Sequence, residues 1–190
     1  MPGPNLFGAF AANGRKFLAS TGSKGGPLEK YVWHLSSVCD LMKHTHRIVV
    51  GKLEAIQQAS SIEEASEFAK ELRGDTLSNS FRARGLCEFF VEHGKVLRKV
   101  IQDNDGNLLK TPLSEVESWQ WLDFCDSLEA RELQVADLYS REIEGFSDII
   151  SRPFERSLEE VKEQARRVRA TLIGQIADFD SLATEFRKRT

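Results

Sequence analysis

Four histidines are the side chains of this sequence best suited to proton transfer or metal binding: His34, His44, His46 and His93. Imidazole titrates near neutral pH, and its ring nitrogens bind transition metals. No two of the histidines are four residues apart, and no Glu-x-x-His or HExxH motif occurs. Asp40 and His44 are four residues apart and could share an ion, but two ligands do not make a site. We therefore expect neither a metal ion nor a cofactor.

His46 and His93 each occupy a position that otherwise belongs to an apolar helix stripe. The simpler interpretation is a buried neutral imidazole whose hydrogen-bond partner fixes the register of neighbouring helices. The alternative is a pH-sensitive interface, because burial lowers a histidine pKa and protonation would then strain the contact. Both residues are candidates for a buried polar switch.

The three cysteines, Cys39, Cys87 and Cys125, are far apart and each lies in an apolar periodic segment. An odd number without a CxxC pair predicts reduced, partly buried thiols in a reducing compartment. The sequence also lacks a Gly-x-Ser-x-Gly motif, a complete phosphate-loop motif and a distinctive pair of carboxylates. We expect no catalytic residues and a protein that is not an enzyme. A ligand carrier or enzyme assembled between helices is an alternative.

Length and composition fit one ordinary domain with a buried core, since 41% of the 190 residues are hydrophobic and 29% are charged. The net charge of −3 argues against nucleic acid as a partner. No run of residues is apolar for long enough to cross a membrane. The expected location is the cytoplasm, with peripheral attachment to a membrane surface as the alternative.

Two long helices are predicted by stripes whose members follow one another at steps of three or four residues. The first stripe is apolar except for His46 and comprises Leu28, Val32, Leu35, Cys39, Met42, His46, Val49, Leu53 and Ile56. The second is apolar except for Gln175 and comprises Leu158, Val161, Ala165, Val168, Leu172, Gln175, Phe179, Leu182 and Phe186. A capping box, Ser157 with Glu160, precedes the second stripe.

The middle of the chain also has helical periodicity, with a second capping box at Ser61 and Glu64. We predict a short helix after Ser61, a break near residues 74–80, a helix over about 80–102 and another over about 111–150. The inward residues of the 80–102 helix are Leu86, Phe89, Phe90, His93, Val96, Leu97, Val100 and Ile101. Gly85 and Gly94 within it would permit close helix contact. The sequence therefore predicts an all-α fold, an elongated antiparallel bundle of four to five helices.

Prolines and glycines are concentrated before residue 28, which separates an N-terminal amphipathic segment from the rest. We expect residues 1–27 to form an arm with a glycine-rich hinge and residues 28–190 to form a single helical-bundle domain. The arm places Leu6, Phe7, Phe10 and Phe17 on one helix face, with Arg15 and Lys16 off it. Such a face either packs on the bundle or docks in a membrane interface or a partner's groove.

Charge is unevenly distributed along the chain. Residues 1–52 carry seven basic and two acidic residues, whereas residues 102–150 carry three basic and twelve acidic ones. Opposite charges could pair helix with helix inside the fold. Otherwise the acidic stretch, represented by Asp123, Asp126 and Glu129, presents a surface to a basic partner.

These patterns favour a non-catalytic interaction or adaptor domain that binds a protein partner through helix faces and the N-terminal arm. The partner could be a second copy of the chain. The alternative is a peripheral membrane module that inserts the N-terminal helix, or a carrier or enzyme within the bundle. The candidate partner- or membrane-binding residues are Leu6, Phe7, Phe10, Arg15, Lys16, Phe17, Asp123, Asp126 and Glu129.

Overall fold

A computed structural model describes residues 6–20, 29–102, 114–129, 134–151 and 156–188. These residues are all-helical, without a strand. The helices are α1 (Leu6–Ser20), α2 (Glu29–Gln58), α3 (Ile62–Lys70), α4 (Gly74–Arg82), α5 (Leu86–Gln102), α6 (Glu115–Glu129), α7 (Gln134–Glu142), α8 (Phe146–Ser151) and α9 (Leu158–Arg187). The all-α prediction is confirmed, but the described residues form more helices than the four to five expected.

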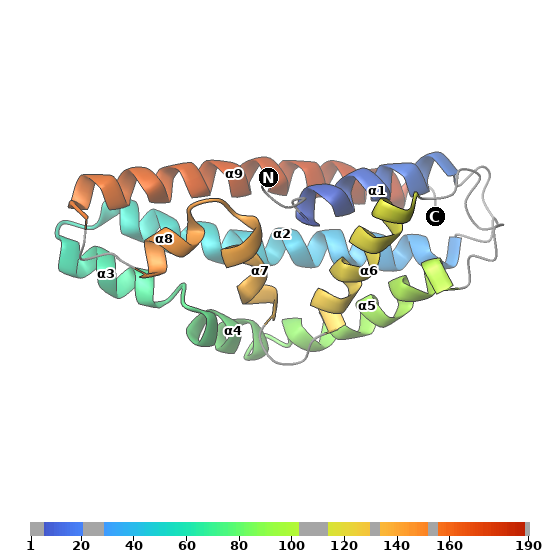
Figure 1. The fold of residues 1–190 in the computed structure, drawn as a ribbon, viewed down its shortest axis with the longest axis horizontal. Helices are drawn as coiled ribbons and strands as arrows, with labels where there is room; N and C mark the ends of the chain where they lie inside the picture. The colour runs from blue at the N-terminus through green and yellow to red at the C-terminus, as the bar shows by residue number, and fades with distance from the viewer. Residues whose placement is uncertain (1–5, 21–28, 103–113, 130–133, 152–155, 189–190) are drawn as a thin grey trace.

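The two longest helices, α2 and α9, lie side by side along the length of the molecule and run in opposite directions (Figure 1). Ion pairs between them show this direction: Lys43 binds Asp180, and Glu54 binds Arg169, so the partner's number falls as the α2 number rises. The apolar residues of both predicted stripes that the structure describes are buried or pack against the core. The remaining helices are shorter: α3 and α5 contact α2, α1 and α8 contact α9, and α6 contacts both α1 and α5.

Two glycines explain part of the higher helix count. Gly85 has a φ of +67° and separates α4 from α5, while Gly145 has a φ of +80° and separates α7 from α8. This left-handed conformation ends a helix and is accessible to glycine at low cost. The prediction of one continuous helix over residues 80–102 is therefore wrong, and so is a single helix through residue 150. Residues 103–113, where a turn and a helix start were expected, lie outside the described residues.

Serine caps begin two of the helices as predicted. Ser157 and Glu160 form the complete reciprocal capping box at the start of α9. Ser61 accepts the Glu64 backbone N–H at the start of α3, but the Glu64 carboxylate accepts from Ser60 instead of from Ser61. The second box is therefore only half formed.

Phe89 is the clearest error in the predicted core of α5. The residues Leu86, Phe90, His93, Leu97 and Val100 are buried and follow steps of four and three. Phe89 lies one residue off this stripe, and its side chain is 51% exposed. The predicted inward face was therefore too wide.

The N-terminal segment belongs to the same hydrophobic core as the rest of the described chain. Leu6, Phe7 and Phe10 are buried, and α1 contacts both α6 and α9. A Cβ placed at Gly14 would lie 2.8 Å from Leu182 of α9, so the two helices approach closely here. Packing on the bundle is thus the arrangement that the structure shows.

Gly94 brings α5 close to α6, as the sequence suggested. A Cβ at this position would lie 3.0 Å from Leu128 Cβ and 3.2 Å from the carbonyl oxygen of Cys125. The backbone of α6 cannot move away as easily as a long side chain could. The close contact therefore leaves little space for a side chain.

Gly94→Val is expected to lower the free energy of unfolding by about 1–3 kcal/mol, because the added methyl groups must displace α6. Gly174→Val is the matched control, since a Cβ at Gly174 meets nothing within 4 Å. We expect that control to change stability by about 0.5 kcal/mol or less. Urea unfolding measures both, and equal effects would contradict the close α5–α6 contact.

None of the helices in the described ranges combines the length and the apolar character that crossing a membrane requires.

Candidate functional site

His46 is fully buried at the centre of a polar network that connects three helices. Its Nε2 lies 2.8 Å from Gln175 Oε1 of α9, and its Nδ1 lies 2.7 Å from the hydroxyl of Tyr139 of α7. The same hydroxyl lies 3.1 Å from Thr45 Oγ1 of α2. His46 therefore joins α2, α7 and α9 through one ring.

The partners of His46 determine where its proton lies. An amide oxygen only accepts, so Nε2 carries the proton and donates it to Gln175. The Tyr139 hydroxyl lies against Nδ1 and donates its one proton to Thr45 Oγ1, which in turn donates to the Met42 carbonyl. Burial lowers the pKa of His46 from 6.5 to about 4 and raises that of Tyr139. Both groups are consequently neutral near neutral pH, and the network has a structural role.

Phe7 covers this network from α1. Its ring packs edge-on against the His46 ring with centroids 5.0 Å apart, and it also contacts Tyr139 and Phe179. The neutral imidazole is therefore enclosed by aromatic side chains. Desolvation is the largest cause of the lowered pKa of His46, and no charged group among the described residues contributes to it.

A second histidine pair joins α2 to α5 closer to the surface. Nδ1 of His34 and Nδ1 of His93 lie 2.9 Å apart, and the ring centroids are 5.1 Å apart. The centroid separation is close to the nitrogen–nitrogen distance plus the two centroid-to-nitrogen lengths. The two nitrogens therefore face each other along the line between the rings, which is the geometry of an N–H···N hydrogen bond.

This geometry fits a shared proton better than a metal ion. A metal bound to both rings would need the two lone pairs to converge on a point about 2.0 Å from each nitrogen, off the line between them. Within the described part of the chain, no group of three or more His, Cys, Asp or Glu side chains could hold a metal. Desolvation by burial lowers the pKa of both His34 and His93, and the nearby Glu92 opposes this effect.

Two of the three predicted acidic residues form ion pairs inside the fold. Arg98 of α5 donates from Nε to Glu129 of α6 at 2.7 Å, and it also pairs with Asp126. Asp123 is half-buried and forms no ion pair with a described residue. The ion pairs of Arg98 with Asp126 and Glu129 therefore link α5 to α6.

The basic residues of the N-terminal helix are paired in the same way. Arg15 donates to Asp178 of α9 at 3.2 Å, and Lys16 pairs with Glu117 of α6. The side chain of Phe17 lies outside the described residues. Leu6, Phe7 and Phe10 are core residues, so these three side chains face the bundle and are not presented to a partner or membrane in this structure.

The three cysteines show no sign of a nucleophilic thiolate. Cys39 and Cys125 are buried, and desolvation raises the pKa of all three thiols. A nucleophilic cysteine requires the opposite shift. Their packing agrees with the predicted reduced, partly buried thiols.

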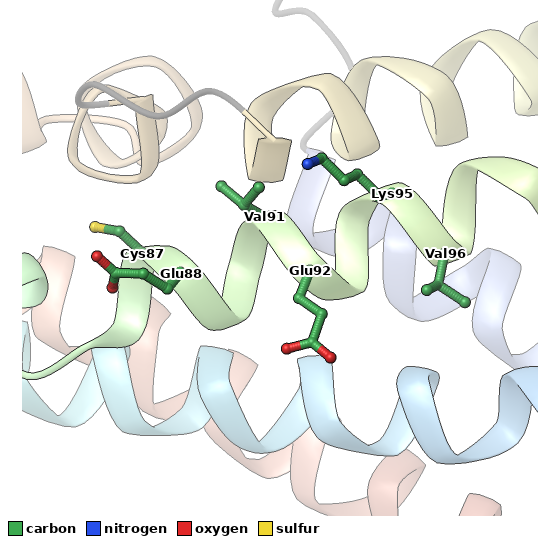
Figure 2. A pocket seen from close by; sticks show the side chains of 6 residues that line it. All are labelled: Cys87, Glu88, Val91, Glu92, Lys95 and Val96. Atoms are coloured by element: carbon green, nitrogen blue, oxygen red, sulfur yellow. The ribbon is translucent and has the colours of Figure 1, made fainter.

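The outer surface of α5 carries a hollow of about 650 Å³. Its described lining comes from α5 alone: Cys87, Glu88, Val91, Glu92, Lys95 and Val96. Figure 2 shows Val91 and Lys95 pointing to one side of the helix, with Glu92 and Val96 pointing to the other. These side chains do not converge on one point, so they form no catalytic arrangement.

Two exposed aromatic side chains lie near the histidine pair. Trp33 of α2 is 58% exposed, and its ring lies 4.7 Å from His34 and 5.2 Å from His93. Phe89, also largely exposed, lies one helical turn before His93 on α5. We call Trp33 and Phe89 the aromatic surface. Sequence reasoning missed it, although Trp33 does lie off the apolar stripe of α2.

Comparison with protein-family models, with curated proteins and with solved structures finds no match.

Proposed function

We propose that the protein is a non-catalytic helical interaction domain that binds a protein partner through the aromatic surface of α2 and α5. The observation that carries this proposal is the exposure of Trp33 and Phe89 on two helices that contact each other. Large aromatic side chains are enriched in protein interfaces and often supply most of the binding energy. Neither residue is needed to fill the core.

The neighbouring chemistry also supports binding rather than catalysis. The imidazoles beneath Trp33 face each other and not a cavity, and the described thiols have raised pKa values. Glu88 and Glu92 border the aromatic surface on α5 and can contribute a polar rim. An apolar centre with a polar border is typical of a protein–protein contact.

The proposal keeps the expected use of helix faces but moves the binding residues away from the N-terminal helix. Binding of a partner or a membrane by Leu6, Phe7 and Phe10 would first require these residues to leave the core. The aromatic surface needs no such rearrangement. Self-association through the aromatic surface is the alternative within this proposal.

Replacing both Trp33 and Phe89 with alanine is expected to weaken partner binding about tenfold or more, because it removes two exposed aromatic anchors. The test is affinity capture from the source cell, with mass spectrometry to identify the protein and titration to measure its affinity. Ile173→Ala on α9 is the matched control, since Ile173 is also an exposed apolar residue.

A partner retained by the wild type and the Ile173→Ala variant but lost by the double alanine variant would support the proposal. Equal retention by all three chains would contradict it. Light scattering at several concentrations distinguishes self-association, which the double variant should also remove. Circular dichroism checks that each variant keeps its helices.

A further inference from the structure

The Nδ1 atoms of His34 and His93 face each other across the α2–α5 contact with room for one proton between them. In the neutral pair, one ring donates through Nδ1–H and the other accepts with its bare Nδ1. The accepting ring then carries its own proton on Nε2. This assignment leaves one ring nitrogen, the Nε2 of the donor, free to take up a proton.

Two protons added in turn have opposite effects on this contact. The first binds the donor's Nε2 and leaves the N–H···N bond intact, now with a charged donor. The second must bind the accepting Nδ1, which faces an N–H only 2.9 Å from nitrogen to nitrogen. Two N–H groups and two positive charges then oppose each other, so the direct contact cannot persist.

We propose that the His34–His93 pair is a pH-sensitive contact whose second protonation separates the two rings and moves Trp33. Trp33 contacts both rings and is mostly exposed, so a separation of α2 from α5 here changes its position directly. His34 is only half-buried and can move toward solvent without crossing the core.

The charged groups around His34 and His93 affect how readily the two rings are protonated. Glu92 of α5 acts on both rings and favours their charged forms. On α6, Asp126 and Glu129 pair with Arg98, and on α9 Asp180 pairs with Lys43. Glu92 is thus the described carboxylate that acts on the pair.

The consequence for binding rests on the proposed function. If Trp33 anchors a partner, the second protonation displaces that anchor, and affinity falls as pH falls. The movement of Trp33 itself is independent of any partner and can be measured on the isolated full-length chain.

The experiment is a pH titration by nuclear magnetic resonance from about pH 8 to about pH 5. It follows the indole N–H signal of Trp33, identified by its absence in Trp33→Phe, together with the ring nitrogens of all four histidines. In the wild type we expect His34 and His93 to titrate in two linked steps, and the Trp33 signal to shift with the second. Circular dichroism confirms that the chain stays folded over this range.

His34→Gln and His93→Gln are each expected to remove the second titration step together with the Trp33 shift that accompanies it, and to leave the remaining ring with a single titration step. His44→Gln is the control, because His44 is an exposed histidine on the same helix and should not alter the response. A Trp33 signal that does not change with the second step in the wild type, or that shows the same second shift in both glutamine variants, would overturn the proposal. Should either variant fail to fold, the wild type alone tests the proposal, because its Trp33 signal should shift with the second titration step and not with the first.

The two proposals fail separately. A partner that depends on Trp33 but binds equally at both ends of the pH range would support the proposed function and contradict its regulation by pH. A pH-dependent Trp33 signal without any partner that needs Trp33 would support the pH-sensitive contact and contradict the proposed function.

Discussion

Replacing Phe10 with alanine is expected to lower the free energy of unfolding by about 3–5 kcal/mol. The Phe10 ring stacks on Phe124 with centroids 4.4 Å apart and on Trp121 at 5.6 Å. All three side chains are almost completely buried. Truncation therefore removes apolar burial and leaves a cavity between α1 and α6.

Phe89→Ala is the matched control, because it makes the same chemical change at an exposed position. We expect it to change stability by about 0.5 kcal/mol or less. Urea unfolding of both variants at neutral pH gives the comparison. If Phe10→Ala costs no more than Phe89→Ala, α1 is not packed in solution as the structure shows.

This comparison also tests the prediction of an N-terminal arm that binds a partner or a membrane. Leu6, Phe7 and Phe10 are buried, and the Leu6 backbone N–H donates to Glu142 at 2.6 Å. Fully burying one such side chain contributes about 1.5–3 kcal/mol. A partner or membrane that captures α1 must therefore supply several kcal/mol before it gains anything.

The parts of the fold that the sequence predicts well are those that depend on local pattern alone. The α2 and α9 stripes each follow a regular period, so the buried face can be identified without knowing its neighbour. His46 and Gln175 each interrupt such a stripe, and the structure shows that they interrupt it opposite each other and form a hydrogen bond. The two polar positions fix the α2–α9 register, as the simpler interpretation of His46 implied.

The parts that sequence reasoning missed depend on how separate helices are aligned. His34 and His93 are 59 residues apart, and nothing local indicates that their rings meet. The ends of the middle helices depend on Gly85 and Gly145, whose positive φ values cannot be distinguished in sequence from a tolerated helical glycine such as Gly94. The aromatic surface likewise appears only when α2 and α5 are placed together.

Lowering the pH is expected to destabilise the fold through His46. In the unfolded chain this histidine titrates near 6.5, whereas in the folded chain its pKa is about 4. Between these values the unfolded state binds more protons, so stability falls as the pH decreases from about 6.5 toward 4 and levels off below that. The difference between the two pKa values corresponds to about 3 kcal/mol.

The measurement is urea unfolding of the wild type and His46→Gln between about pH 7 and about pH 4.5. We expect the wild type to lose about 2–3 kcal/mol more over this range than the variant, even if the variant is less stable at pH 7. The contributions of His34, His93 and the carboxylates are common to both chains and cancel in the difference. His44→Gln should retain the wild-type pH dependence, since His44 is exposed. Parallel curves for the wild type and His46→Gln would show that the imidazole at the centre of the network is not held neutral by burial, and the structural role assigned to it would then have to be abandoned.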